Sequence, residues 1–418
     1  MNRIYRTASI LTYITAFIIT TETLTVPLFG YMGFTNRNEP ILLIYLFCLT
    51  PFFFIPKTRP TPGSYITYLF YMLIYVPTIV VIYHLSSTLA LSTDPTPMSL
   101  AMLSCMLIVI AQQYIPKPFT PSFNISIRIK TLRNICISLG AVFLIIVTVK
   151  LYKYFSITGL FDVYEKRQAI MDLQIGFMRY IQSWLTNVIL PVLFTIFITS
   201  KHKKLAAISI ITYIYLFFLG GHKTYLFAPA FLALALYSYN NKGNYQTKIN
   251  FIFSAAISFP LLGLLAYEDF FKLWTGMVNV RTFSIQGLAA GVYHDFFADH
   301  PFTYMSQLKF FSLLNEYPYT SDIPIVLNNA YGLGNFNSHT FFSDGYSSFG
   351  YLGMIASALG LSTYLYLFDS LTQKNTKFFL VATAFYTSTL LNVSLATSLL
   401  TFGGLIFILI ALIRIREE

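Results

Sequence analysis

The chain has 418 residues, of which 56% are hydrophobic and only 10% are charged, and its formal net charge is +11. A soluble domain carries about 25% charged residues, so this composition excludes an ordinary water-soluble protein and indicates an integral membrane protein. The basic residues stand in small groups between apolar runs, which is typical of membrane orientation signals and excludes a nucleic-acid partner.

Apolar segments that approach the length of about 20 residues needed to cross a bilayer recur along the chain. The first is too long for a cleaved signal peptide, and no small-residue cleavage site follows it. We predict an all-α polytopic membrane protein, one transmembrane domain over 1–418, with about 12 spans. They lie near 8–29, 41–55, 65–83, 98–115, 133–151, 180–199, 205–220, 224–239, 250–267, 347–368, 378–394 and 398–413.

The positive-inside rule sets the predicted orientation. With both termini in the cytoplasm, 17 of the 27 Lys and Arg residues fall on cytoplasmic segments. They are Arg3, Arg6, Lys57, Arg59, Lys117, Arg128, Lys130, Arg133, Lys201, Lys203, Lys204, Lys242, Lys248, Lys374, Lys377, Arg414 and Arg416. This threading leaves two long exterior segments, a loop over 152–179 and a large, partly helical loop over 268–346.

The loops contain no Walker-type phosphate loop and no dinucleotide-binding fingerprint. An enzyme of this kind would therefore take its energy from an activated substrate at the outer face, such as a lipid-linked diphosphate. The three cysteines, Cys48, Cys105 and Cys136, lie in or beside apolar segments, so we expect neither a disulfide framework nor a metal site from them.

The first exterior loop contains FDVYEKRQAI (161–170). Arg167 and Lys166 could clamp a phosphate, and Asp162 and Glu165 could contact sugar; the alternative is a solvated interfacial helix. The next polar motif is GGHKT (220–224), which predicts a tight turn at Gly220–Gly221. Its His222 and Lys223 then lie at the outer surface, either near a lipid diphosphate or merely as turn residues.

Two polar motifs lie in the first half of the large loop, NVRTFSIQG (279–287) and HDFFADHPF (294–302). Arg281 is a candidate phosphate clamp, unless its guanidinium only reaches toward lipid headgroups. The His and Asp residues of the second motif resemble metal ligands, but their spacing favours a simpler interpretation, in which Asp299 or His300 caps a new helix with Pro301 in its first turn. His300 remains a candidate substrate-binding residue.

The motif HTFFSDGYSSFGYLG (339–353) lies at the junction of the large loop and the next predicted span. His339 is a candidate general base for a sugar hydroxyl, and Asp344 could bind hydroxyls. The alternative is an ordinary capped helix entry. Gly345, Gly350 and Gly353 would let the start of this helix pack closely against its neighbours.

These motifs resemble the O-antigen polymerases, the Wzy-type polymerases of oligosaccharide repeat units. The resemblance rests on the topology, on the stretch from Arg281 through YHDFFADHP (293–301), and on His339 followed by Gly350 and Gly353. Two departures are Gln286, where the family commonly has Pro, and Thr340, where the wider polymerase and ligase superfamily usually has Asn.

The resemblance implies a GT-C-like, membrane-embedded and metal-independent glycosyltransferase without cofactors, in the bacterial inner membrane. It implies an undecaprenyl-diphosphate-linked oligosaccharide as substrate, and a chain-length regulator and a flippase as partners. His339 and Arg281 would be catalytic, and Arg167, Lys223, His222, Asp344 and His300 would bind substrate. Two alternatives stay open: an O-antigen ligase that transfers to lipid A core, and a transporter or flippase of lipid-linked sugars, for which Glu22 within the first span is the residue to test.

Overall fold

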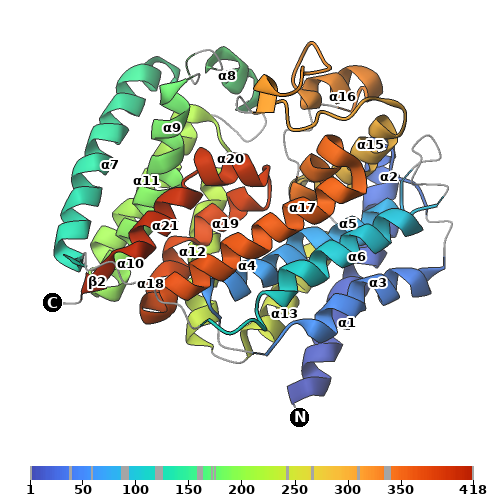
Figure 1. Ribbon diagram of the computed structural model, residues 1–418, viewed down its shortest axis with the longest axis horizontal. Coiled ribbons are helices and arrows are strands. Elements are labelled where there is room, and N and C mark those ends of the chain that lie inside the picture. Colours follow the sequence, from blue (N-terminus) through green and yellow to red (C-terminus); the bar gives the residue numbers. More distant parts are fainter. Residues whose placement is uncertain are drawn as a thin grey trace.

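The computed structural model describes residues 2–36, 40–57, 60–85, 94–117, 126–157, 163–170, 173, 176–241, 244–264, 268–307, 311–333 and 340–416. Its named elements in this part of the chain are helices, apart from two short parallel strands in which Ser126 pairs with Arg414. Among the described residues, six helical stretches are long and apolar enough to cross a bilayer: Ile4–Met32, Pro62–Ile82, Ile129–Tyr154, Phe177–Thr199, Lys203–Gly220 and Phe341–Ala382. The chain is therefore an all-α membrane protein (Figure 1).

The elements of the first half are α1 (Asn2–Thr20), η1 (Thr21–Thr25), α2 (Val26–Phe29), η2 (Gly30–Met32), α3 (Ile41–Phe54), α4 (Pro62–Phe70), η3 (Tyr71–Tyr75), α5 (Val76–Ile82), α6 (Thr96–Ala111), β1 (Ser126–Arg128), α7 (Ile129–Leu151), η5 (Tyr152–Tyr154), α8 (Val163–Ile170), α9 (Phe177–Trp184), η7 (Leu185–Ile189) and α10 (Leu190–Thr199). Those of the second half are α11 (Lys203–Gly220), α12 (Thr224–Asn240), α13 (Tyr245–Ser258), η9 (Phe259–Leu264), α14 (Glu268–Trp274), η10 (Thr275–Ser284), α15 (Ile285–Asp299), η11 (Phe311–Leu313), α16 (Ile323–Tyr331), α17 (Phe341–Thr372), η12 (Gln373–Asn375), α18 (Thr376–Ala382), α19 (Ala384–Leu390), α20 (Leu395–Leu400), α21 (Gly404–Leu412) and β2 (Arg414–Arg416).

The last two predicted spans are not continuous helices. The segment 378–394 is divided into α18 and α19 at Thr383, and 398–413 is divided into α20 and α21 by Gly403, whose φ of 99° lies in the left-handed region. The nine residues of α21 rise only about 14 Å, less than half of the roughly 30 Å hydrocarbon core. Each of the ten earlier predicted spans coincides with helix over most of its length.

Prolines explain three of the four π-helical turns that occur within the described ranges. A proline clashes with the carbonyl four residues earlier and donates no hydrogen bond, so a helix that continues through it must widen locally. The turns η1, η3 and η7 each end two residues before a proline, namely Pro27, Pro77 and Pro191. The fourth, η10, is ten residues long and carries Arg281, but it has no proline in or just after it.

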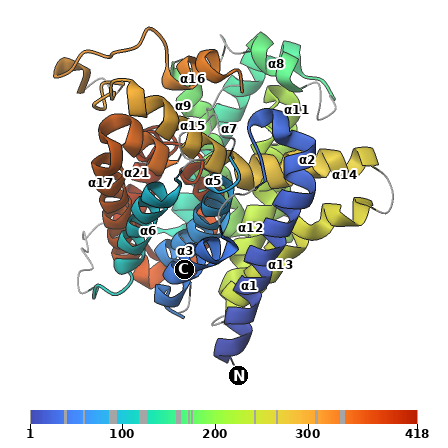
Figure 2. The same cartoon turned by 90° about the vertical axis from the view of Figure 1, so that its right-hand side faces the viewer.

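The segment 268–299, the start of the large predicted loop, is one continuous run of helix formed by α14, η10 and α15. It crosses the bundle rather than running along α1, as Figure 2 shows. Its α15 part is buried between α5 and α17. A Cβ on Gly287 would lie 2.5 Å from Val81 Cβ, so this glycine is what allows α15 to approach α5 closely.

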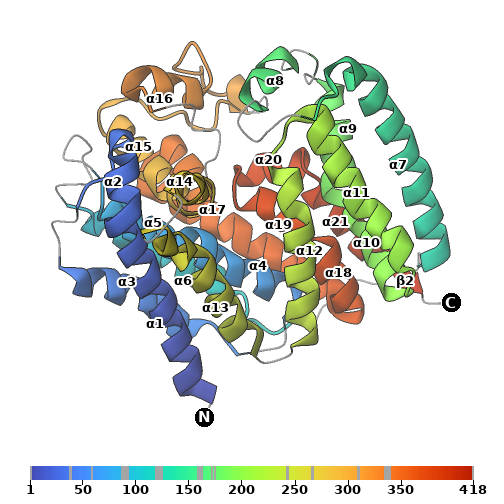
Figure 3. The same cartoon turned by 180° about the vertical axis from the view of Figure 1, so that it is seen from behind.

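Two sides of the molecule can be followed in Figures 1 and 3. The helices α1 to α6 and α13 to α15 form one side, α7 to α12 and α18 to α21 form the other, and α17 runs between them. α8 and α16 lie together at the end of the molecule farthest from the N-terminus. We call this end the α8 end.

Candidate functional site

The short helix α8 is attached to the end of α11 by Lys166. This side chain is 8% exposed and donates hydrogen bonds to the Phe218 carbonyl oxygen and, at 3.1 Å, to Ser156 Oγ. The Phe218 carbonyl belongs to the last turn of α11, where a cation is favoured by the unsatisfied carbonyls. Burial lowers the pKa of Lys166. Lys166 therefore does not join a phosphate clamp, as the sequence had suggested, but fixes α8 in place.

We call four basic residues the cationic cluster: Arg167 of α8 and Arg179 of α9, which both act electrostatically on His222 of the α11–α12 turn, and Lys223, which follows His222 in the chain. The predicted tight turn is confirmed, because α11 ends at Gly220 and Gly221 caps it with a φ of 67°. Arg167 and Arg179 are exposed, whereas His222 and Lys223 are partly buried. Both guanidinium groups act electrostatically on His222, so the structure brings together three of the predicted residues and adds Arg179.

The environment of His222 keeps its imidazole neutral near pH 7. Burial, followed by the positive charges of Arg167 and Arg179, lowers its pKa to about 4. A neutral imidazole offers one donor and one acceptor nitrogen. Concentrated positive charge of this kind favours an anionic ligand, which would offset the repulsion among the cations.

A line of buried and partly buried polar side chains leads away from the cationic cluster, and we call it the polar column: Gln182, Thr186, Asn187, Thr389, Asn392 and Gln286. Thr389 donates to Asn187 Oδ1 at 2.7 Å, and the Gln286 amide donates to Asn392 Oδ1 at 2.9 Å. Gln286 lies on the same continuous helix as Arg281. Buried polar groups within a membrane protein are costly and are commonly functional. The column therefore connects the cationic cluster with the helix that carries Arg281.

Arg281 lies on the π-helical segment η10, which packs against η1. Its side chain is exposed and makes no hydrogen bond or ion pair within the described part of the chain. The neighbouring Phe283 is buried against Tyr13 and Phe17 of α1. The packing fixes this stretch of helix and leaves the guanidinium available to a ligand.

Glu22 lies in η1, and its carboxylate is 3.6 Å from Nε2 of the fully buried His84. His84 Nδ1 is 2.7 Å from the Val80 carbonyl oxygen, so a protonated Nδ1 donates a hydrogen bond to that oxygen. The one acidic residue predicted within a span therefore has a titratable partner just after α5.

The start of α17 contains a sharp break at Phe349 and Gly350, where the Gly350 φ is 61°. The carbonyl oxygens of Ser347 and Ser348 accept hydrogen bonds from the backbone N–H groups of Thr303 and Tyr304 instead of continuing a helix. A Cβ on Gly353 would overlap the Gly345 carbonyl oxygen. The three predicted glycines thus allow two stretches of α17 backbone to touch.

Asp344 is partly buried in the first turn of α17. Burial, and then the nearby Asp344 carboxylate, raises the pKa of Tyr293 on α15. Asp344 therefore lies against the far part of the helix that carries Arg281. His339, the predicted general base, lies outside the described residues.

The predicted helix start at Asp299–Pro301 is wrong, because α15 ends at Asp299 instead. A residue before proline is disfavoured in the helical conformation, and His300 is extended, with φ −119° and ψ 151°. His300 is exposed, and its ring stacks on Phe296 with ring centres 4.0 Å apart.

The other polar residues of this motif have protein partners. Tyr331 donates to Asp295 at 2.5 Å, and His294 Nε2 is 2.8 Å from the Tyr351 hydroxyl. No three His, Cys, Asp or Glu side chains within the described ranges are placed to hold a metal ion.

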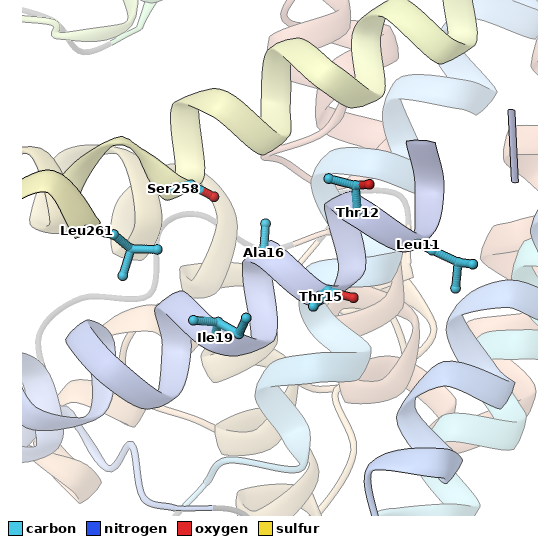
Figure 4. Close-up of a pocket in the computed structure, with 7 residues that line it drawn as sticks. All are labelled: Leu11, Thr12, Thr15, Ala16, Ile19, Ser258 and Leu261. Atoms are coloured by element: carbon cyan, nitrogen blue, oxygen red, sulfur yellow. The ribbon is translucent and has the colours of Figure 1, made fainter. Parts of the chain in front are cut away.

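A groove of about 460 Å³ opens between α1 and the end of α13. Figure 4 shows its lining, which is apolar or hydroxyl-bearing and includes Thr12, Ala16 and Ser258. It contains no charged side chain, so it offers no group for the chemistry that the cationic cluster indicates.

Sequence reasoning missed Arg179 and Gln182, which face the cluster from α9. Their signal was present as FMRYIQSW (177–184), where an Arg and a Gln three residues apart open an apolar span and therefore share one helix face.

No protein-family model matches the chain, and no curated protein or solved structure is significantly similar to it.

Proposed function

We propose that this chain polymerises undecaprenyl-diphosphate-linked oligosaccharide repeat units at the periplasmic face of the bacterial inner membrane. The α8 end then faces the periplasm, and both termini face the cytoplasm. The observation that supports this most is the cationic cluster at one end of a membrane protein. A lipid diphosphate combines the two features that such a site selects, a concentrated negative charge and an anchor in the bilayer.

The proposed reaction transfers the growing glycan from one lipid to the next repeat unit. A sugar hydroxyl of the incoming unit forms a bond to the anomeric carbon of the growing chain, and the bond from that carbon to the diphosphate breaks. His339 takes the hydroxyl proton, and undecaprenyl diphosphate leaves. Arg281 and the cationic cluster stabilise the charge that builds up on the leaving diphosphate.

Deletion of the gene and a lipopolysaccharide banding gel test this function. Loss of the polymerase should leave single capped repeat units, whereas loss of an O-antigen ligase would leave none. Complementation with Arg281→Ala, His339→Ala or Arg179→Ala should fail to restore the ladder, while the exposed Arg128→Ala at the opposite end should restore it. Full chain length with both Arg281→Ala and His339→Ala would disprove the catalytic roles.

A second candidate function is transport of lipid-linked sugars, which the pairing of Glu22 with the buried His84 favours. Transporters place titratable groups within their spans. Glu22→Gln decides between the two functions. Loss of all surface polysaccharide in that variant, with Arg281→Ala unaffected, would favour transport.

A further inference from the structure

Gln182 is a buried amide whose donor capacity is not filled by the described part of the protein. Its side chain is 5% exposed, and its Nε2 atom makes no hydrogen bond within the described part of the chain. A buried N–H group without a partner costs folding free energy, and native proteins rarely leave one. The amide has two N–H groups, so even with the Tyr225 hydroxyl beside it at least one donor is left for a ligand.

The surroundings of Gln182 belong to the cationic cluster. Gln182 lies three residues after Arg179 on α9, and such residues share one face of a helix. Its amide interacts with the Tyr225 hydroxyl. The ring of Tyr225 lies 5.3 Å from that of His222, and Arg167 acts electrostatically on both. Gln182 therefore forms the inner side of the cluster.

We propose that Gln182 Nε2 donates a hydrogen bond to a phosphate oxygen held by the cationic cluster. This inference rests on the proposed function and adds the residue that recognises the phosphate from the membrane side. A neutral amide suits that position, because burying another charged group there would cost more than burying an amide. The ligand is a phosphate group, supplied either by a lipid diphosphate or by free pyrophosphate.

Tryptophan fluorescence of the full chain in lipid nanodiscs measures this contact. The chain has two tryptophans, and Trp274→Phe leaves Trp184, two residues from Gln182, as the reporter. Titration with undecaprenyl diphosphate should change the emission, whereas undecaprenol without phosphate should not. Gln182→Leu should weaken the binding of undecaprenyl diphosphate by about tenfold or more, since hydrogen bonds to charged groups are the strong ones.

The chain offers a matched control in Gln112, which is 1% exposed and whose amide atoms also lack partners among the described residues. It follows α6 and lies on the predicted cytoplasmic side, so Gln112→Leu should bind like the parent. Gln182→Glu keeps the size of the side chain but removes the donor and adds a negative charge, so it should weaken binding further. It also provides the test if Gln182→Leu does not fold.

The arms of the experiment separate the alternatives. Weaker binding of both undecaprenyl diphosphate and inorganic pyrophosphate in Gln182→Leu supports a phosphate contact. The affinities of the parent for the two ligands then show whether the site prefers the lipid diphosphate or free pyrophosphate. Unchanged binding of both overturns the inference, as does a loss seen only with a glycan-bearing lipid, which would assign Gln182 to sugar. A chain that binds the lipid diphosphate through Gln182 but yields no polymer would instead overturn the proposed function.

Discussion

His222 is a neutral imidazole beside two positive charges, so its protonation reports on an anion in the cationic cluster. Its pKa is lowered to about 4 by burial and then by Arg167 and Arg179. A bound diphosphate favours the imidazolium and raises this pKa. As the pH falls from the pKa of His222 in the complex to its pKa in the free protein, the complex therefore carries a proton that the free protein lacks. We expect the affinity for undecaprenyl diphosphate to rise over that interval, by at most about tenfold per pH unit, and to level off below pH 4. Titrations at pH 4–8 measure this.

The control for His222 is His222→Asn, which can still form hydrogen bonds but does not titrate. The phosphate groups of the ligand lose charge at low pH, with a pKa near 6, and this variant reports that contribution alone. Its affinity should therefore fall with decreasing pH where that of the parent rises. Parallel pH profiles for the two proteins would contradict the proximity of His222 to the bound anion.

At the scale of elements, α8 is held by the buried Lys166. Lys166→Met keeps most of the apolar stem but removes the hydrogen bonds to Phe218 and Ser156, at a cost of about 1–3 kcal/mol. We expect amide hydrogen exchange in 163–170 to accelerate by about tenfold or more, because α8 then opens from α11. Lys130→Met, in the exposed first turn of α7, should leave this exchange unchanged. Unchanged exchange in Lys166→Met would mean that other contacts hold α8.

The break in α17 gives a second prediction for an element. A Cβ on Gly353 would overlap the Gly345 backbone, which cannot move aside as a side chain can. Gly353→Ala should therefore destabilise the protein by about 1–3 kcal/mol or more, seen as a lower melting temperature in detergent. Gly30→Ala is the control, because a Cβ at Gly30 would have no other atom within 4 Å and the Gly30 φ is −56°. Equal melting temperatures for the two variants would contradict the close backbone contact.

Hydropathy located the first ten helical segments because each is an apolar run bounded by charge or proline. It did not detect the breaks at Thr383 and Gly403, since both stand inside apolar runs and differ from their neighbours in backbone conformation rather than polarity. It could place Arg167, His222 and Lys223 at one surface through their loops. Arg179 and Gln182 were missed because their role depends on which face of α9 meets α12, which only packing decides.

At the scale of the whole molecule, Asp369 shows why long-range contacts cannot be deduced from one chain. It directly follows the predicted span 347–368, at the end that the predicted orientation puts in the cytoplasm, but it is 2% exposed. It accepts hydrogen bonds from Thr61 Oγ1 at 2.6 Å and from the Gly63 N–H at 2.7 Å, and pairs with Lys117 Nζ at 2.6 Å. The contacts with Thr61 and Gly63 join the end of α17 to the N-terminus of α4, whose positive partial charge favours a carboxylate.

The predicted orientation of the whole molecule can be tested with cysteine labelling. Cys48, Cys105 and Cys136 are buried, so the parent should react little with a membrane-impermeant maleimide. Glu316→Cys, exposed between η11 and α16, should be labelled in cells whose outer membrane alone is permeabilised, because the predicted orientation puts the α8 end in the periplasm. Lys203→Cys, exposed at the start of α11, should be labelled only after the inner membrane is opened. The reverse pattern would place the cationic cluster in the cytoplasm, where a periplasmic polymerase could not use it, and would remove the support that the cluster gives to the proposed reaction.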